Sequence, residues 1–147
     1  MCLSKIINSE HITTSVSETE HFGAEIAFFA VANGIKTVAL YGGLGAGKTA
    51  FVRGFCSGLG CDAEVSSPTY SYMNEYKCEE IDVYHFDMYK VKTIEDVHSV
   101  GFFDYLNAGG IMVIEWSENV DGFLTEETLK ILINVGKNEN ERIIIVK

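Results

Sequence analysis

The sequence predicts one α/β domain with a mostly parallel central sheet to which antiparallel hairpins are added. Three observations favour this fold class. Helix-like and strand-like segments alternate early in the chain, short apolar runs bounded by glycines are typical of buried parallel strands, and the last two strand-like segments are joined by a short polar turn. Because 147 residues suffice for one packed core, we expect a single domain, 1–147.

The first element is expected to be a helix that ends near Gly34. Ser17 and Glu20 have the spacing of a capping box, and apolar side chains then recur on one helical face. The segment 37–41 that follows is short, partly β-branched and bounded by glycines, as a buried parallel strand is. A second helix is expected over about 49–59, closed by a glycine.

The second half of the chain contains more strands than helices. Segments 70–76 and 81–86 are separated by a polar turn and predict a β-hairpin. Thr93 is expected to cap a short helix, which continues after Gly101. The run "IMVIEW" (111–116) predicts a buried strand, and "LKILINV" and "RIIIVK", joined by "GKNEN", predict a closing hairpin.

Composition limits the possible locations and partners of the protein. Apolar residues make up 47% of the chain, no run is long enough to span a bilayer, and the N-terminus has no continuous apolar segment. We therefore expect a soluble, cytoplasmic protein without a membrane partner. The four cysteines show neither a C-x-x-C pair nor zinc-ligand spacing, so reduced thiols are expected.

The charge argues against extended direct contact with nucleic acid. The chain has 21 acidic and 11 basic residues, a formal charge of −10, and no cluster of lysine and arginine. Phosphate contacts supply most of the affinity for RNA and DNA. The sequence therefore predicts that any nucleic acid is held by a partner.

A glycine-rich turn carries the strongest functional signal. The segment 42–49, "GGLGAGKT", fits the phosphate-binding motif G-x-x-x-x-G-K-[ST] and lies between a predicted strand and a predicted helix. Glycines let backbone N–H groups face a phosphate, Lys48 can reach the β and γ phosphates of ATP, and Thr49 can offer its hydroxyl to Mg²⁺. This motif favours a three-layer fold of the P-loop NTPase type. The residues expected to bind the nucleotide are Gly43, Leu44, Gly45, Ala46, Gly47, Lys48, Thr49 and Ala50.

Two carboxylates are the candidate catalytic and metal-binding residues. Glu115 ends a buried strand and Asp87 ends "VYHFD", so both can lie at the carboxyl edge of a parallel sheet, where such folds bind ligands. Either can bind Mg²⁺ together with Thr49 or orient the attacking water. The alternative for each is an ordinary carboxylate at a strand end.

Three further residues have weaker signals. Thr69 follows Pro68 in a loop, where a hydroxyl can contact the γ-phosphate of a nucleotide, although an ordinary turn fits equally well. His85 could carry a proton, but a lone histidine in a strand is more often structural. Trp116 is expected in the core or in the wall of a pocket.

Several motifs together resemble one protein family. "YGGLGAGKT", "SSPTYSYMNEY", "YHFDMYK", "GFFDYL" and "IMVIEWSENV" occur in the order found in the TsaE (YjeE) family of bacterial ATPases for tRNA threonylcarbamoyladenosine synthesis. The resemblance implies that Thr49 and Glu115 bind Mg²⁺, that Asp87 is required for activity, and that Ser67, Pro68 and Thr69 form a switch-like segment. It also implies TsaB and TsaD as partners, with tRNA held only indirectly. The chain departs from the family pattern at Lys90 and Ser117, which bear on partner contacts.

Other classes of function remain as alternatives. A small-molecule kinase on the same loop would use several arginines to clamp the phosphates, whereas this chain has only Arg53 and Arg142. A GTPase is disfavoured because no N-K-x-D segment is present. A non-hydrolysing, nucleotide-gated binding module would fit if Glu115 and Asp87 pointed away from the phosphates.

Overall fold

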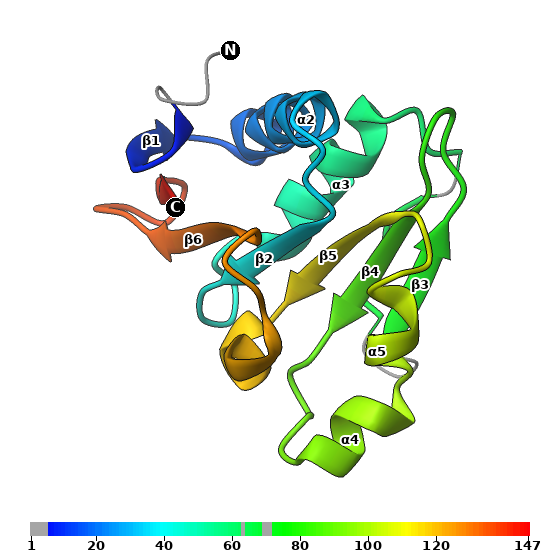
Figure 1. The fold of residues 1–147 in the computed structure, drawn as a ribbon. Coiled ribbons are helices and arrows are strands. Elements are labelled where there is room, and N and C mark those ends of the chain that lie inside the picture. The colour runs from blue at the N-terminus through cyan, green and yellow to red at the C-terminus, as the bar shows by residue number, and fades with distance from the viewer. Residues whose placement is uncertain (1–5, 63, 69–71) are drawn as a thin grey trace.

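The fold is built on one mixed sheet. The computed structural model describes residues 6–62, 64–68 and 72–147, and its seven strands have the order β1-β7-β6-β2-β5-β4-β3 (Figure 1). The strands are β1 (Ser9–Thr13), β2 (Thr37–Tyr41), β3 (Met73–Tyr76), β4 (Val83–Asp87), β5 (Ile111–Glu115), β6 (Leu129–Val135) and β7 (Arg142–Val146).

Parallel strands form the centre of the sheet. Strand β2 pairs in parallel with both β5 and β6, and β4 pairs in parallel with β5. The flanking pairings, β6 with β7, β7 with β1 and β3 with β4, are antiparallel. The predicted α/β class, with hairpins added to a parallel centre, is therefore confirmed.

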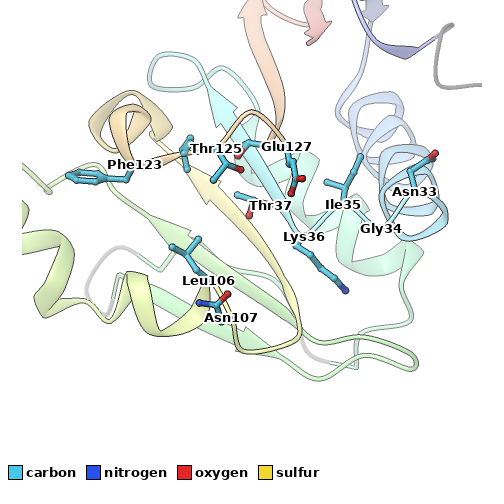
Figure 2. A pocket seen from close by; sticks show the side chains of 12 residues that line it. Asn33, Gly34, Ile35, Lys36, Thr37, Leu106, Asn107, Phe123, Thr125 and Glu127 are labelled. Atoms are coloured by element: carbon cyan, nitrogen blue, oxygen red, sulfur yellow. The ribbon is translucent and has the colours of Figure 1, made fainter.

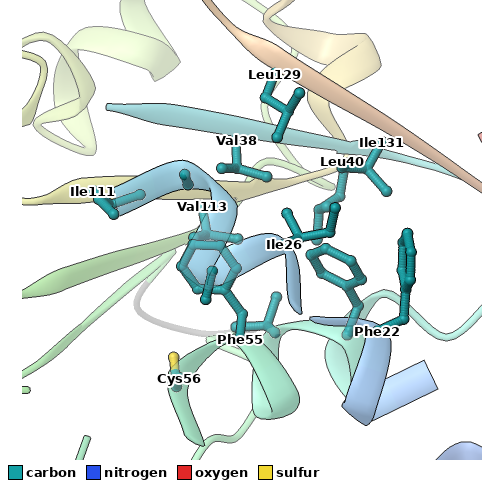
Figure 3. Close-up of a cluster of buried hydrophobic side chains, with 14 of the residues drawn as sticks. Phe22, Ile26, Val38, Leu40, Phe55, Cys56, Ile111, Val113, Leu129 and Ile131 are labelled. Carbon is teal, nitrogen blue, oxygen red and sulfur yellow. The ribbon is translucent and has the colours of Figure 1, made fainter. Parts of the chain in front are cut away.

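Helices cover both faces of this sheet (Figure 1). The helices are α2 (Val16–Ala32), α3 (Lys48–Gly58), α4 (Ile94–Ser99) and α5 (Phe102–Tyr105), and two short 3₁₀ turns follow β5. Alternate residues of β5 divide between two hydrophobic clusters, with Val113 on the side of α2 and α3 and Ile114 on the side of α4 and α5. Figure 3 shows the first cluster, where Phe22 and Phe55 of the two long helices face β2, β5 and β6.

Most predicted elements are confirmed, with small shifts in their ends. Helix α3 begins one residue before the predicted start, and α4 begins after Thr93, whose side chain forms a capping box with Asp96. The predicted closing hairpin forms as β6 and β7. Of the other predicted hairpin, residues 70 and 71 lie outside the described residues.

The predicted start of the first helix is wrong by two residues. Ser15, not Ser17, is the N-cap, because its hydroxyl accepts a hydrogen bond from the Glu18 N–H at 3.0 Å. The pairs Ser15–Glu18 and Ser17–Glu20 have the same spacing, so local sequence does not distinguish them. Strand β1, which ends at Thr13 just before this N-cap, was not predicted from the sequence.

The expectation of reduced cysteines is wrong for one pair. Cys61 and Cys78 form a disulfide, and Cys56 is buried as a free thiol. The end of α3 lies against the β3–β4 turn, where the Glu79 N–H donates to the Leu59 carbonyl at 3.3 Å. This tertiary contact brings the two sulfurs together. The spacing of the cysteines in the sequence does not reveal the contact.

Helices α2 and α3 approach each other closely. A Cβ atom placed on Gly54 of α3 would lie 1.7 Å from the Glu20 carbonyl oxygen of α2. Because that oxygen belongs to backbone, it cannot move without displacing the helix. The absence of a side chain at Gly54 therefore sets the position of α3, and with it the glycine-rich loop that precedes this helix.

The strand ends that matter for function meet at one edge. Strands β2, β4 and β5 run parallel, so Tyr41, Asp87 and Glu115 lie at their carboxyl ends, along the same edge of the sheet.

Within the described residues, no helix is both long enough and apolar enough to span a membrane.

Replacing Gly54 with alanine should lower the free energy of unfolding. Alanine gains about 1 kcal/mol of helix propensity, but overpacking against the α2 backbone costs about 3 kcal/mol, so we expect a net loss of about 2 kcal/mol. Chemical denaturation of the Gly54→Ala variant measures this loss. Gly122→Ala is the control, because nothing lies within 4 Å of a Cβ atom at that position. Equal stability of the two variants would contradict the packing argument.

Candidate functional site

A cleft opens at the carboxyl edge of the sheet. Its volume is about 490 Å³. The residues that line it are Val16, Leu44, Gly45, Ala46, Gly47, Lys48, Thr49, Ala50, Ser67, Asp87, Tyr89, Glu115, Trp116 and Arg142. The predicted site residues from 44 to 50 thus meet Asp87 and Glu115 in one place. Gly43 lies in the same loop but does not line the cleft, and Thr69 lies outside the described residues.

The glycine-rich loop leads directly into α3. Gly45 and Gly47 adopt positive φ angles of 74° and 104°, which side chains disfavour. Gly47 is the N-cap of α3 and supplies no side-chain acceptor. The first-turn N–H groups of a helix have no partner within the helix, so this end of α3 offers donors and a positive dipole end to an anion.

Lys48 lies between the loop and an aromatic ring. The side chain is buried, and its ammonium donates hydrogen bonds to the carbonyls of Gly42 and Gly43, the latter at 3.0 Å. The same Nζ lies 4.0 Å from the centre of the Trp116 ring. Burial lowers the pKa of Lys48, while nearby carboxylates, Glu115 first among them, act in the opposite direction.

Glu115 is a buried carboxylate with two side-chain donors. It is 3% exposed. The Thr49 hydroxyl donates to its two oxygens at 3.2 and 3.3 Å, and Nε2 of His85 lies 2.5 Å from Oε2. The two predicted magnesium ligands, Thr49 and Glu115, thus lie within hydrogen-bonding distance of each other, although they are 66 positions apart.

Asp87 lies beside Glu115 on the neighbouring strand. The two residues are paired in the parallel register of β4 and β5. Asp87 is 9% exposed, and its oxygens accept hydrogen bonds from the Ser67 hydroxyl at 3.2 Å and the Tyr89 N–H at 3.0 Å. Asp87 and Glu115 thus face the same cleft as the glycine-rich loop.

The side chains of Thr49, Glu115 and Asp87 fit a magnesium ion. All three offer oxygen, the ligand atom that Mg²⁺ prefers, and Mg²⁺ in nucleotide sites needs only one or two carboxylates besides phosphate and water. In the described part of the chain, no group of three or more histidine, cysteine, aspartate and glutamate side chains could hold a metal by itself.

Arg142 is a cleft residue whose position the sequence analysis did not predict. Its guanidinium donates to the carbonyls of Ala46 at 2.8 Å and Gly45 at 3.2 Å, and also to the Glu139 carbonyl in the β6–β7 turn at 2.6 Å. Arg142 therefore ties the loop to the closing hairpin. No local signal could have revealed this contact, because Arg142 and Ala46 are 96 positions apart.

A second cavity, of about 630 Å³, lies elsewhere and has different chemistry. Figure 2 shows that its walls come from the α2–β2 connection, the end of α5 and the segment before β6. It contains Thr37, the first residue of β2, and so lies at the opposite end of this strand from the glycine-rich loop. It is larger than the cleft, but it contains no pair of carboxylates, so we take the cleft as the candidate site.

Curated proteins with similar sequences share one description, "tRNA threonylcarbamoyladenosine biosynthesis protein TsaE". The Haemophilus influenzae protein is 41% identical over 105 residues, which span 71% of this chain and 65% of that protein. The Rickettsia typhi protein is 35% identical over 93% of both chains, and the Bacillus subtilis protein is 34% identical over 88% of this chain and 80% of its own.

A solved structure has a similar fold. The crystal structure of YdiB from Bacillus subtilis superposes with a TM-score of 0.73 at 27% sequence identity and covers 94% of this chain and 84% of that one. The family model described as "Threonylcarbamoyl adenosine biosynthesis protein TsaE" matches residues 13–144, nearly the whole length of the chain. The protein therefore belongs to the TsaE family of threonylcarbamoyl adenosine biosynthesis proteins.

Proposed function

We propose that this protein is a Mg²⁺-dependent ATPase with a fold of the P-loop NTPase type. In this proposal it works in the cytoplasm as an accessory subunit of the TsaB–TsaD pair, which modifies tRNA. The observation that carries the proposal is the contact between the Thr49 hydroxyl and the Glu115 carboxylate at the start of α3, with Asp87 beside it. It unites a phosphate-binding loop with the carboxylates that hydrolysis needs.

The loop and Lys48 would bind the triphosphate. The N–H groups at the start of α3 would donate to phosphate oxygens, and the Lys48 ammonium would leave the carbonyls of Gly42 and Gly43 for the β and γ phosphates. Replacing the carbonyl oxygens by phosphate oxygens is favourable, because a hydrogen bond between two charged groups is stronger than one from a charged group to a neutral carbonyl. In this proposal residues 43–50 bind the nucleotide.

The two carboxylates would complete the site. Thr49 and Glu115 would hold Mg²⁺, and Asp87 would bind a water molecule of the metal or orient the attacking water; Thr69, expected from sequence to contact the γ-phosphate, lies outside the described residues. When bound, the metal would neutralise the negative charge that develops on the phosphate oxygens. Ser67, which donates to Asp87 at 3.2 Å, would keep that carboxylate turned toward the cleft.

The arginines favour an ATPase over a small-molecule kinase. Arg53 pairs with Glu20 at 2.9 Å, and Arg142 is engaged with loop carbonyls. Only Arg142 lines the cleft, whereas a small-molecule kinase would use several arginines to clamp the phosphoryl group on its way to a second substrate. If no phosphoryl group is transferred to a second substrate, ATP hydrolysis would instead drive a change of conformation or assembly in a partner.

The charge of the protein supports an indirect relation to tRNA. With a formal charge of −10, the chain would be repelled by a polyanion. Partners such as TsaB and TsaD would hold the tRNA, while this subunit would bind them and reset them through its ATPase cycle. The family membership supports this assignment.

Removing either carboxylate charge should slow turnover. Glu115→Gln and Asp87→Asn should each lower kcat for ATP by more than about tenfold, because each removes a group that stabilises or orients the reacting atoms. ATP should still bind. Glu126→Gln, at an exposed position, is the matched control. Full turnover in both cleft variants would reject the catalytic assignment of the two carboxylates.

Trp116 should report nucleotide binding. It is the single tryptophan of the chain, and the Lys48 ammonium lies 4.0 Å from its ring, so movement of Lys48 toward phosphate changes the surroundings of the indole. Titration with ATP should change the tryptophan emission of the wild type but not that of Lys48→Met. Unchanged wild-type emission at ATP concentrations that calorimetry shows to be saturating would contradict the movement of Lys48.

A purified TsaB–TsaD pair should raise ATP turnover or form a complex with this protein. Turnover is measured alone and with the pair, and complex formation by gel filtration with Mg²⁺ and ATP. Turnover that is equal in both conditions, with no complex, would reject the accessory role and leave a free-standing ATPase.

A further inference from the structure

His85 is a buried polar residue that the mechanism above does not use. It lies in β4, two residues before Asp87, and its side chain is fully buried. Burial of a polar ring costs free energy unless both nitrogens find partners. The hydrogen-bond partners of His85 connect its side chain to the cleft.

The stronger partner is Glu115. Nε2 of His85 lies 2.5 Å from Oε2 of Glu115, and the two side chains are 0% and 4% exposed. Because a carboxylate only accepts hydrogen bonds, the ring N–H is the donor. The ring and the carboxylate are therefore in direct contact within the core.

Tyr76 holds the other side of the ring. Its hydroxyl lies 3.3 Å from Nδ1 of His85, and it also donates to the Ser66 carbonyl at 3.2 Å. The Asn74 side chain donates to the same hydroxyl at 3.2 Å. Tyr76 is thus fixed by its own hydrogen bonds and restricts the orientation of the histidine ring.

The sheet register explains why these groups meet. His85 is the partner of Val113 in β5, and Glu115 follows two residues later, so both project from the same face. Tyr76 is the partner of Val83, two residues before His85. The three side chains form a diagonal across β3, β4 and β5 on the face covered by α3, which carries Thr49.

We propose that His85 is a positioning residue that sets the orientation of the Glu115 carboxylate toward Thr49 and the metal. The ring contacts Oε2 only and so leaves Oε1 to complete the metal site, while the Thr49 hydroxyl lies 3.2 Å from Oε1 and 3.3 Å from Oε2. Outer-shell partners of this kind commonly orient metal ligands. The proposal rests on the function proposed above and adds a residue to it.

Two variants separate positioning from simple packing. His85→Leu removes the donor and keeps an apolar side chain in the core. His85→Gln retains an N–H group near the position of Nε2. His21→Gln, on the exposed face of α2, is the matched control, since the His21 side chain is 81% exposed.

The test is a Mg²⁺ titration of the ATP complex followed by Trp116 emission, together with ATP binding in EDTA and the melting temperature. His85→Leu should raise the Mg²⁺ concentration at half saturation by about tenfold or more, while ATP affinity in EDTA stays unchanged. His85→Gln should recover most of the loss. If His85→Leu does not fold, Tyr76→Phe, which frees the ring at Nδ1, should shift the Mg²⁺ titration in the same direction.

The outcomes distinguish the two proposals. Mg²⁺-dependent nucleotide binding in the wild type, with an unchanged titration in His85→Leu, would overturn the role of His85 alone. A loss in His85→Leu that His85→Gln does not restore, or an unchanged titration in Tyr76→Phe where it replaces His85→Leu, would also overturn it. A wild type without Mg²⁺-dependent binding would overturn the proposed function, and the role of His85 with it.

Discussion

The buried carboxylate of Glu115 is the constraint on which the cleft depends. A carboxylate that is 3% exposed costs free energy unless donors replace the water that it has lost. Its donors, the Thr49 hydroxyl and the His85 ring, come from the start of α3 and from β4. One side chain therefore links the glycine-rich loop to two strands, and the position of each segment is tied to that of the others.

The rest of the fold supplies the alignment that this contact requires. Parallel pairing of β4 with β5 places Asp87 beside Glu115. Close approach of α2 and α3 at Gly54 fixes the helix that carries Thr49, and Arg142 holds the loop through the carbonyls of Gly45 and Ala46. Contacts with the sheet, α2 and the closing hairpin thus hold the loop and α3 in place, as a preorganised site requires.

Local patterns predicted much of this structure from sequence. The motif 42–49, the apolar runs at β2 and β5 and the cap at Thr93 each contain their signal within a few residues, and the corresponding elements are present. The neighbouring positions of Glu115 and Asp87 could also be predicted, because the carboxyl ends of parallel strands meet at one edge of the sheet.

Features that depend on distant or ambiguous contacts could not be predicted. Ser15 and Ser17 each precede a glutamate by three residues, so the sequence does not show which of them is the N-cap. The disulfide between Cys61 and Cys78 depends on the contact between the end of α3 and the β3–β4 turn. The contact of His85 with Glu115 needs the register of two strands, which no local pattern contains. A lone histidine in a strand therefore suggested only a structural role.

The central claim is that Thr49 and Glu115 form a magnesium site at the phosphate-binding loop. A crystal structure with Mg²⁺ and a non-hydrolysable ATP analogue tests it most directly. We predict a metal about 2.1 Å from the Thr49 hydroxyl oxygen, held by Glu115 directly or through water, with the Lys48 ammonium on the phosphates. A nucleotide bound at the cavity of Figure 2, or a metal remote from both side chains, would contradict the account.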